Sequence, residues 1–233
     1  MHTNPDPNSQ RSHDHAERRS GTRWISLGEA IIGSLVVLGH SVWHVLPNSV
    51  PLLFAMALIS FRLREGSWTA MGLGSPKSWV STAIIAVAAA IVQQAIGQFV
   101  VDPLTHPFMH YAAGANPMEG MHGSSGVLRW LGIIWTYAAF GEEIGYRGYL
   151  LNRVADLGGR SRTALLVGLL WSSTMFGFAH WYQGPAGVVS SAVSGLVFGA
   201  AYLLAGENLW VAICAHGFSD TFGLLATYSG LAS

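Results

Sequence analysis

Apolar stretches long enough to cross a lipid bilayer recur along this chain. A helix rises about 1.5 Å per residue, so about 20 apolar residues span a hydrocarbon core of about 30 Å. Backbone polar groups in lipid need partners within their own segment, which favours helices. The expected fold class is therefore all-α, a polytopic membrane helix bundle of about six to eight helices. Its expected segments are residues 24–45, 50–61, 79–101, 127–155, 163–181, 186–205 and 209–226.

Charged residues are scarce outside the N-terminus. They make up 10% of the chain, against 51% for hydrophobic residues, whereas soluble domains carry about 25% charged residues. We therefore expect an integral, multi-pass protein whose surroundings are the lipid bilayer. The formal net charge is zero, so the charge balance indicates no nucleic-acid partner.

The chain divides at residue 23. Residues 1–23 are polar and are expected to form a disordered tail, and residues 24–233 to form the transmembrane domain. Basic residues at Arg23, Arg62 and Arg160 fall on one side of the membrane if six or seven segments cross. The positive-inside rule then places the N-terminus in the cytoplasm, with the protein in the cell (inner) membrane.

Two glutamates and an arginine lie within the segment 127–155. Ionisable groups at membrane depth are costly, so their presence is a hypothesis of function. Glu143 and Arg147 are four residues apart, on one helical face, and Glu142 is rotated from them by about 100°. We expect Arg147 to neutralise Glu143, which leaves Glu142 free to act.

Histidines occur at membrane depth in two later segments. His180 ends the segment 163–181, while His216 and Asp220 share one face of the last segment. Counted from the turn near Gly158, Glu142 lies about 16 residues back and His180 about 22 forward, which gives similar heights on antiparallel helices. We expect these four side chains to meet inside the bundle.

The order Glu-Glu-x-x-x-Arg, Phe-x-x-x-His and His-x-x-x-Asp resembles the intramembrane CAAX-prenyl-protease and bacteriocin-processing family, also called CPBP or Abi. The resemblance implies an endopeptidase like CAAX prenyl protease 2, acting on membrane-associated peptides or proteins, either prenylated or plain. The motif core spans residues 127–228, and its motif positions are Glu142, Glu143, Arg147, Phe176, His180, His216 and Asp220.

The same resemblance implies a role for each motif residue. Glu142, assisted by His180, activates a water molecule. His216 and Asp220 face the developing oxyanion or the leaving group. Phe176 packs around His180 and contributes to substrate binding. Family members often have asparagine at the position of Asp220. An ionised aspartate cannot donate to an oxyanion, so it is protonated, acts through His216 or ligates a metal.

Two alternatives stay open. A zinc ion held by His180, His216 and a glutamate would activate water instead, although the family resemblance and the absence of a His-Glu-x-x-His helix favour a metal-free reaction. A loop with His106, His110 and His122 has irregular spacing that favours a solvated segment over a metal site.

The second alternative is a non-catalytic immunity or partner-binding protein that is held together by the same polar network.

Overall fold

The computed structural model describes residues 7–105 and 123–230, with side chains from residue 22 onward. This part of the chain contains no β-strand, and it forms seven long helical rods, which confirms the all-α prediction. The rods are α1 (Pro7–Ser41), α2 (Ser49–Arg64), α3 (Trp79–Ile96) with η2 (Gly97–Val101) and α4 (Asp102–Thr105), α5 (Gly123–Ile133) with η4 (Ile134–Glu142), η5 (Ile144–Leu151) and α6 (Asn152–Leu157), α7 (Arg162–Ala179), α8 (Gly184–Leu204) and α9 (Leu209–Tyr228); η1 (Trp68–Met71) and η6 (Trp181–Gln183) are short 3₁₀ turns.

The outer surface of the bundle is apolar. Val80 is 70% exposed and Ile84 is 65% exposed on α3, and Leu166 is 56% exposed on α7. A soluble monomer rarely leaves apolar patches of this extent in water. By length and composition, four helices are suited to cross a membrane: Thr22–Ser41, Trp79–Thr105, Trp181–Leu204 and Leu209–Tyr228. The chain is thus an integral membrane protein, as its composition predicted.

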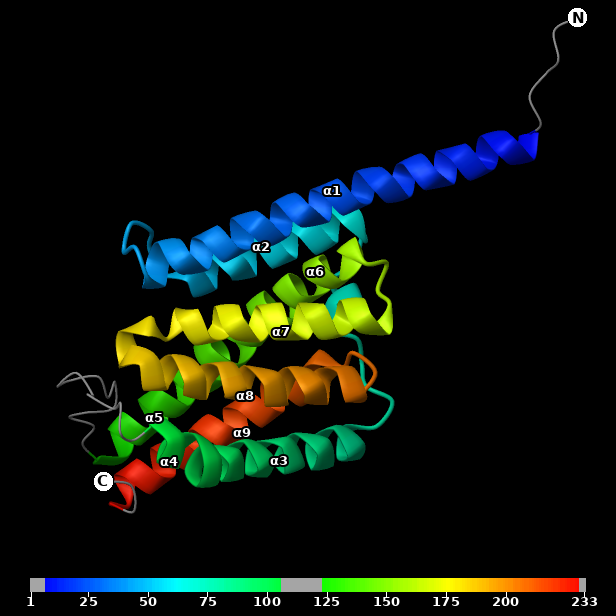
Figure 1. The fold of residues 1–233 in the computed structure, drawn as a ribbon. Helices are drawn as coiled ribbons and strands as arrows, with labels where there is room; N and C mark the ends of the chain where they lie inside the picture. Colours follow the sequence, from blue (N-terminus) through cyan, green and yellow to red (C-terminus); the bar gives the residue numbers. More distant parts are fainter. Residues whose placement is uncertain (1–6, 106–122, 231–233) are drawn as a thin grey trace, which may run out of the picture.

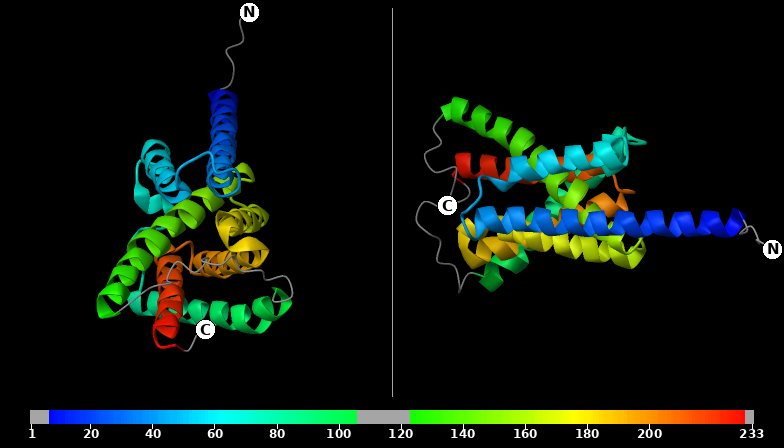
Figure 2. Two further views of the ribbon diagram at one scale, coloured as in Figure 1. Left: turned by 90° about the vertical axis from the view of Figure 1, so that its left-hand side faces the viewer. Right: turned by 90° about the horizontal axis from the view of Figure 1, so that it is seen from above.

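Helix α9 occupies the centre of the bundle. It packs against α3, α8 and η4, and in the end-on view of Figure 2 it lies between α3 and the helix that begins with α5. Val211, Ala212 and Ala215 on this helix are completely buried. Small and branched side chains there allow neighbouring helices to approach closely. The last sequence motif, which starts at His216, therefore lies deep in the bundle.

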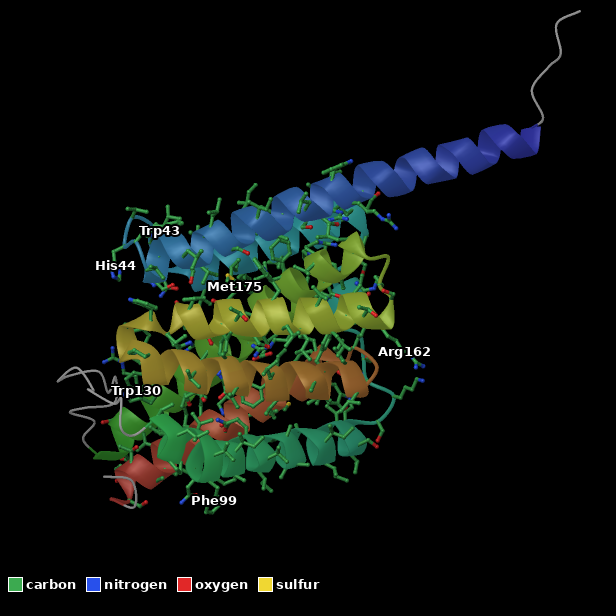
Figure 3. All side chains as sticks on the ribbon, viewed as in Figure 1. Trp43, His44, Phe99, Trp130, Arg162 and Met175 are labelled. Carbon is green, nitrogen blue, oxygen red and sulfur yellow. The ribbon has the colours of Figure 1, made fainter. Side chains whose placement is uncertain are left out.

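The helices run between two chemically different ends. Figure 3 shows Trp43, His44 and Trp130 at one end and Arg162 at the other. Helix α1 begins at Pro7, and its first turns extend past the other helices on the Arg162 end (Figures 1 and 2). The predicted division of the chain at residue 23 stays a prediction.

A buried ion network joins α1, α2 and α6 near the Arg162 end. The Nη1 atom of Arg153 lies 2.8 Å from Glu65 Oε1 and 2.9 Å from Asp156 Oδ2, and its Nε lies 3.2 Å from Glu29 Oε2. Glu29 also pairs with Arg64. The Arg153 side chain is 1% exposed. One guanidinium therefore pairs with carboxylates on α1, on α6 and at the C-cap of α2.

The long rod that starts with α3 extends further than expected. The expected segment ended at residue 101, but Asp102–Thr105 continues the helix as α4. The bonding widens to a π-helix over η2, which ends two residues before Pro103. A proline ring clashes with a regular α-helical turn, and the wider turn relieves that clash.

Gly72 is expected to be a stability determinant. Its φ is +99°, and a Cβ at this position would lie 2.3 Å from the carbonyl oxygen of Glu207. Replacement of Gly72 by Ala should lower the free energy of unfolding by about 2 kcal/mol or more, because backbone strain of about 1–3 kcal/mol adds to the clash. Thermal unfolding in detergent would measure the change.

A matched glycine on α1 gives the control for that substitution. A Cβ at Gly28 would meet no atom within 4 Å. Gly28→Ala should leave the melting temperature unchanged or slightly raised, since alanine favours a helix over glycine. Equal melting temperatures for the two variants would contradict the tight contact between η1 and the turn before α9.

Candidate active site

The acidic helix widens where its two glutamates lie. The chain runs as an α-helix through α5, changes to π-helical bonding in η4 and η5, and returns to an α-helix in α6. The sequence predicted a regular helix over this region, so the π-helical stretch is a finding of the structure. Such turns are rare and occur frequently at functional sites.

Glu143 forms the predicted pair with Arg147. Arg147 Nη1 lies 2.8 Å from Glu143 Oε1, and neither side chain is exposed. The guanidinium also lies over the ring of Phe176, 4.6 Å from its centroid. A buried ion pair of this kind needs such additional contacts to offset its loss of hydration. The expected neutralisation of Glu143 is therefore present in the structure.

His216 is held between two carboxylates. Its Nδ1 lies 2.9 Å from Glu143 Oε1, and its Nε2 lies 3.4 Å from Asp220 Oδ2. The ring of Phe198 stacks against the imidazole with centroids 5.2 Å apart. The contact with Asp220 follows from helical spacing, but the contact with Glu143 joins two helices and was not foreseen. Glu143 thus orients His216 in addition to pairing with Arg147.

His180 has a defined orientation at the end of α7. Its Nδ1 lies 2.9 Å from the carbonyl oxygen of Phe176. A carbonyl oxygen only accepts, so the Nδ1–H donates and Nε2 keeps a free lone pair. The rings of Phe176 and His180 are 4.8 Å apart in an edge-to-face arrangement, which agrees with the predicted packing. Phe176 itself is 2% exposed.

A cavity of about 490 Å³ brings the expected residues together. Its walls include Glu142, Phe176, His180, His216 and Asp220, so the predicted convergence of these side chains is found. The Oε2 atom of Glu142 has no hydrogen-bond partner among the residues that the structure describes. Glu143 does not line the cavity. The two glutamates therefore differ as expected: one is held by a cation and a histidine, and the other faces the cavity.

Comparison with known proteins agrees with this geometry. Residues 124–222 match the model of a family described as type II CAAX prenyl endopeptidase, Rce1-like. That segment, called the Rce1-like segment below, is similar to the Rce1-like family. The resemblance noted in the sequence is thereby confirmed, and the Rce1-like segment contains every motif position from Glu142 to Asp220. No curated protein and no solved structure matched the chain.

The donor atoms of the Rce1-like site do not fit a zinc centre. Both ring nitrogens of His216 face carboxylates, so a metal would have to displace Glu143 or Asp220. In residues 22–105 and 123–230, no three His, Cys, Asp or Glu side chains are placed to hold a metal ion. Catalytic zinc needs about three such protein ligands. His106, His110 and His122 lie outside the described residues.

Part of the cavity wall comes from outside the Rce1-like segment. Gln93 and Gln94 of α3 line the cavity together with Ser194 and Ser219. Both glutamines face neighbouring helices, α8 and α9, and their place beside the candidate site was not predicted. The length and polarity of a helix can indicate that a residue faces other parts of the protein. They do not indicate which helix that residue contacts.

Proposed function

We propose that this protein is an intramembrane endopeptidase that cleaves membrane-associated peptides with water activated by Glu142 and His180, without a metal ion. The observation that carries the proposal is the division between the two adjacent glutamates. Glu143 is bound to Arg147 and His216, whereas Glu142 lines the cavity and its Oε2 atom has no hydrogen-bond partner among the described residues. A general base needs such an unpaired acceptor within reach of water.

Glu142 acts twice in the proposed reaction, first as a base and then as an acid. Water lies between the Glu142 carboxylate and Nε2 of His180, and Glu142 accepts a proton as the water oxygen attacks the peptide carbonyl carbon. The resulting tetrahedral intermediate carries a negative charge on the former carbonyl oxygen. Glu142 then gives its proton to the leaving nitrogen as the C–N bond breaks. Proton transfers of this kind contribute about 10²- to 10⁴-fold to a rate.

His216 is the candidate stabiliser of the oxyanion. Its contact with Asp220 is 3.4 Å, longer than a strong charge-assisted hydrogen bond. With both ring nitrogens protonated, Nδ1–H donates to Glu143, and the weakly held Nε2–H is available to the oxyanion that forms in the cavity. A preorganised donor of this type stabilises the transition state more than the substrate.

Asp220→Asn should retain activity to within about tenfold. An asparagine oxygen still accepts from Nε2 of His216, and its amide can donate to the oxyanion as a carboxylate cannot. Initial rates of peptide cleavage by the two proteins at equal concentration would measure the effect. A loss beyond about 100-fold would mean that the charge of Asp220 is required.

The topology follows from the two ends of the bundle. Arg162 lies at one end (Figure 3), and the end of α2 with Arg62 lies at the same end as the start of α7. By the positive-inside rule, this end lies on the cytoplasmic side of the cell (inner) membrane. A reporter fused before α1 should then be cytoplasmic.

The deciding experiment is peptide cleavage by purified protein in liposomes. The substrates are a library of peptide tails, each prenylated and plain, with and without a zinc chelator. We expect cleavage that the chelator does not affect. Comparison of the cleavage rates of prenylated and plain peptides then shows whether lipid modification of the substrate matters. Loss of cleavage with chelator would support the zinc alternative. Folded protein that cleaves no peptide would favour the partner-binding alternative.

A further inference from the structure

A chain of hydrogen bonds lines one wall of the cavity. Gln94 Nε2 lies 3.1 Å from the main-chain oxygen of Ser219 and 3.2 Å from its hydroxyl. The Ser219 hydroxyl donates to Gln93 Oε1 at 2.5 Å. Gln93 Nε2 in turn donates to the hydroxyl of Ser194 at 2.9 Å. This polar wall joins α3 to α8 and α9, and Ser219 directly precedes Asp220.

The direction of these bonds fixes how Gln94 is turned. The main-chain oxygen of Ser219 only accepts, so the atom facing it has to be the amide nitrogen of Gln94. The hydroxyl hydrogen of Ser219 is already donated to Gln93, so the hydroxyl oxygen is the acceptor of the bond from Gln94. Both contacts use the nitrogen. The carbonyl oxygen of Gln94 is left without a partner in the described part of the chain.

An amide oxygen without a partner is costly at membrane depth. Helix α3 is otherwise strongly apolar and carries no charged residue between Trp79 and Ile96. The Gln94 side chain is not enclosed by protein, and lipid offers no hydrogen-bond donor, so only cavity water or a bound ligand can donate to this oxygen. Gln94 lines the same cavity as Glu142 and His216. The free acceptor is thus beside the candidate catalytic groups.

A second part of the cavity lining differs in character. It is formed by Ile133, Ile134 and Ala138 of α5 and η4, with Trp130 and Tyr137. An extended peptide presents main-chain N–H groups on its edges and side chains on its faces. One polar wall with a free acceptor and one apolar wall suit an extended peptide with apolar side chains.

We propose that Gln94 accepts a hydrogen bond from a main-chain N–H of an extended, apolar peptide substrate, and that the polar wall is the subsite that binds the substrate backbone. The inference rests on the proposed function. Gln93 is a positioning residue in this subsite, because it holds the Ser219 hydroxyl that accepts from Gln94. The chemistry recognised is a secondary amide, whether or not the substrate also carries a lipid.

The test is a binding cycle on the Glu142→Gln variant, which removes cleavage from the measurement. The probe is the tightest-binding member of a fluorescent library of eight-residue apolar peptides, followed by anisotropy in lipid nanodiscs. Each of its main-chain nitrogens is then methylated in turn. We expect one methylation to weaken binding by about 3- to 10-fold, the scale of one hydrogen bond. Gln94→Met should weaken binding of the unmethylated peptide by the same factor. In the Gln94→Met protein, that methylation should then weaken binding no further.

Gln98 supplies the matched control on the same helix. It lies one turn beyond Gln94 and does not line the cavity. Gln98→Met should bind the peptides as the parent does. The inference is overturned if Gln94→Met and Gln98→Met behave alike, if every methylation weakens binding to Gln94→Met as it does to the parent, or if no peptide binds.

The outcomes separate this inference from the proposed function. If a peptide binds through Gln94 but the wild-type protein never cleaves a peptide, the subsite stands and the protease proposal fails. If the wild-type protein cleaves peptides and Gln94→Met binds them unchanged, the protease proposal stands and the subsite fails.

Discussion

Glu142→Gln is expected to abolish peptide cleavage while the protein stays folded. The substitution keeps the shape of the side chain but removes its ability to take a proton from water, which should lower the rate by about 10²- to 10⁴-fold. Stability should change little, because Glu142 Oε2 has no hydrogen bond to lose among the described residues. Cleavage rates and melting temperatures measured on the same preparation would show both effects.

The neighbouring substitution, Glu143→Gln, should fail in a different way. It leaves the guanidinium of Arg147 buried without its counter-charge and weakens the contact that orients His216. Removing one partner of a buried ion pair costs about 3–5 kcal/mol. We therefore expect a marked fall in the melting temperature, accompanied by loss of activity.

The contrast between these two variants tests the division of roles. Activity lost with the fold intact in Glu142→Gln, and both lost in Glu143→Gln, is the expected pattern. If Glu142→Gln unfolds as readily as Glu143→Gln, the glutamates belong to one structural network, which is the partner-binding alternative. Unchanged cleavage by Glu142→Gln would exclude it as the base.

Arg153→Met is expected to have the largest effect on stability away from the candidate site. It removes the guanidinium that pairs with Glu29, Glu65 and Asp156, together with its contact on the ring of Phe61. Three partly buried carboxylates are then left with less positive charge around them. We expect a loss of about 3 kcal/mol in the free energy of unfolding.

Arg160→Met is the matched control for Arg153. Arg160 pairs with Asp156 and Glu207, but its side chain is 38% exposed. Ion pairs in contact with solvent contribute about 0–1 kcal/mol, so its loss should lower the melting temperature little. Equal effects of the two substitutions would contradict a stabilising role specific to the buried arginine.

The fold was predictable because lipid leaves a chain few options. Segment lengths alone indicated the helices, and the observed α8 (Gly184–Leu204) and α9 (Leu209–Tyr228) begin and end within about two residues of those expected. The pair of Glu143 and Arg147 was also predictable, since both residues lie on one helix and their spacing defines their relation.

Contacts between helices were harder to predict. The bond from Glu143 to His216 and the bonds from Gln93 and Gln94 to α8 and α9 depend on how each helix is rotated against its neighbours. Depth counting placed Glu142 and His180 at similar heights but carries no information on rotation. The π-helical stretch was missed for the same reason, because hydrophobic pattern does not report a change in hydrogen bonding.

The π-helical stretch also has a consequence for how this helix can change over time. Each π turn holds one residue more than the α turn it replaces, so the stretch is equivalent to insertions that the packing tolerates. Deleting a single residue between Ile134 and Glu142 should restore a narrower turn. We expect Trp130 and Ile133 to rotate about the helix axis, away from the cavity, while Glu143 and Arg147 stay in place. Gain or loss of one residue in this stretch would thus rotate the half of the helix that lines the cavity with Trp130 and Ile133 relative to the half that holds Glu143 and Arg147.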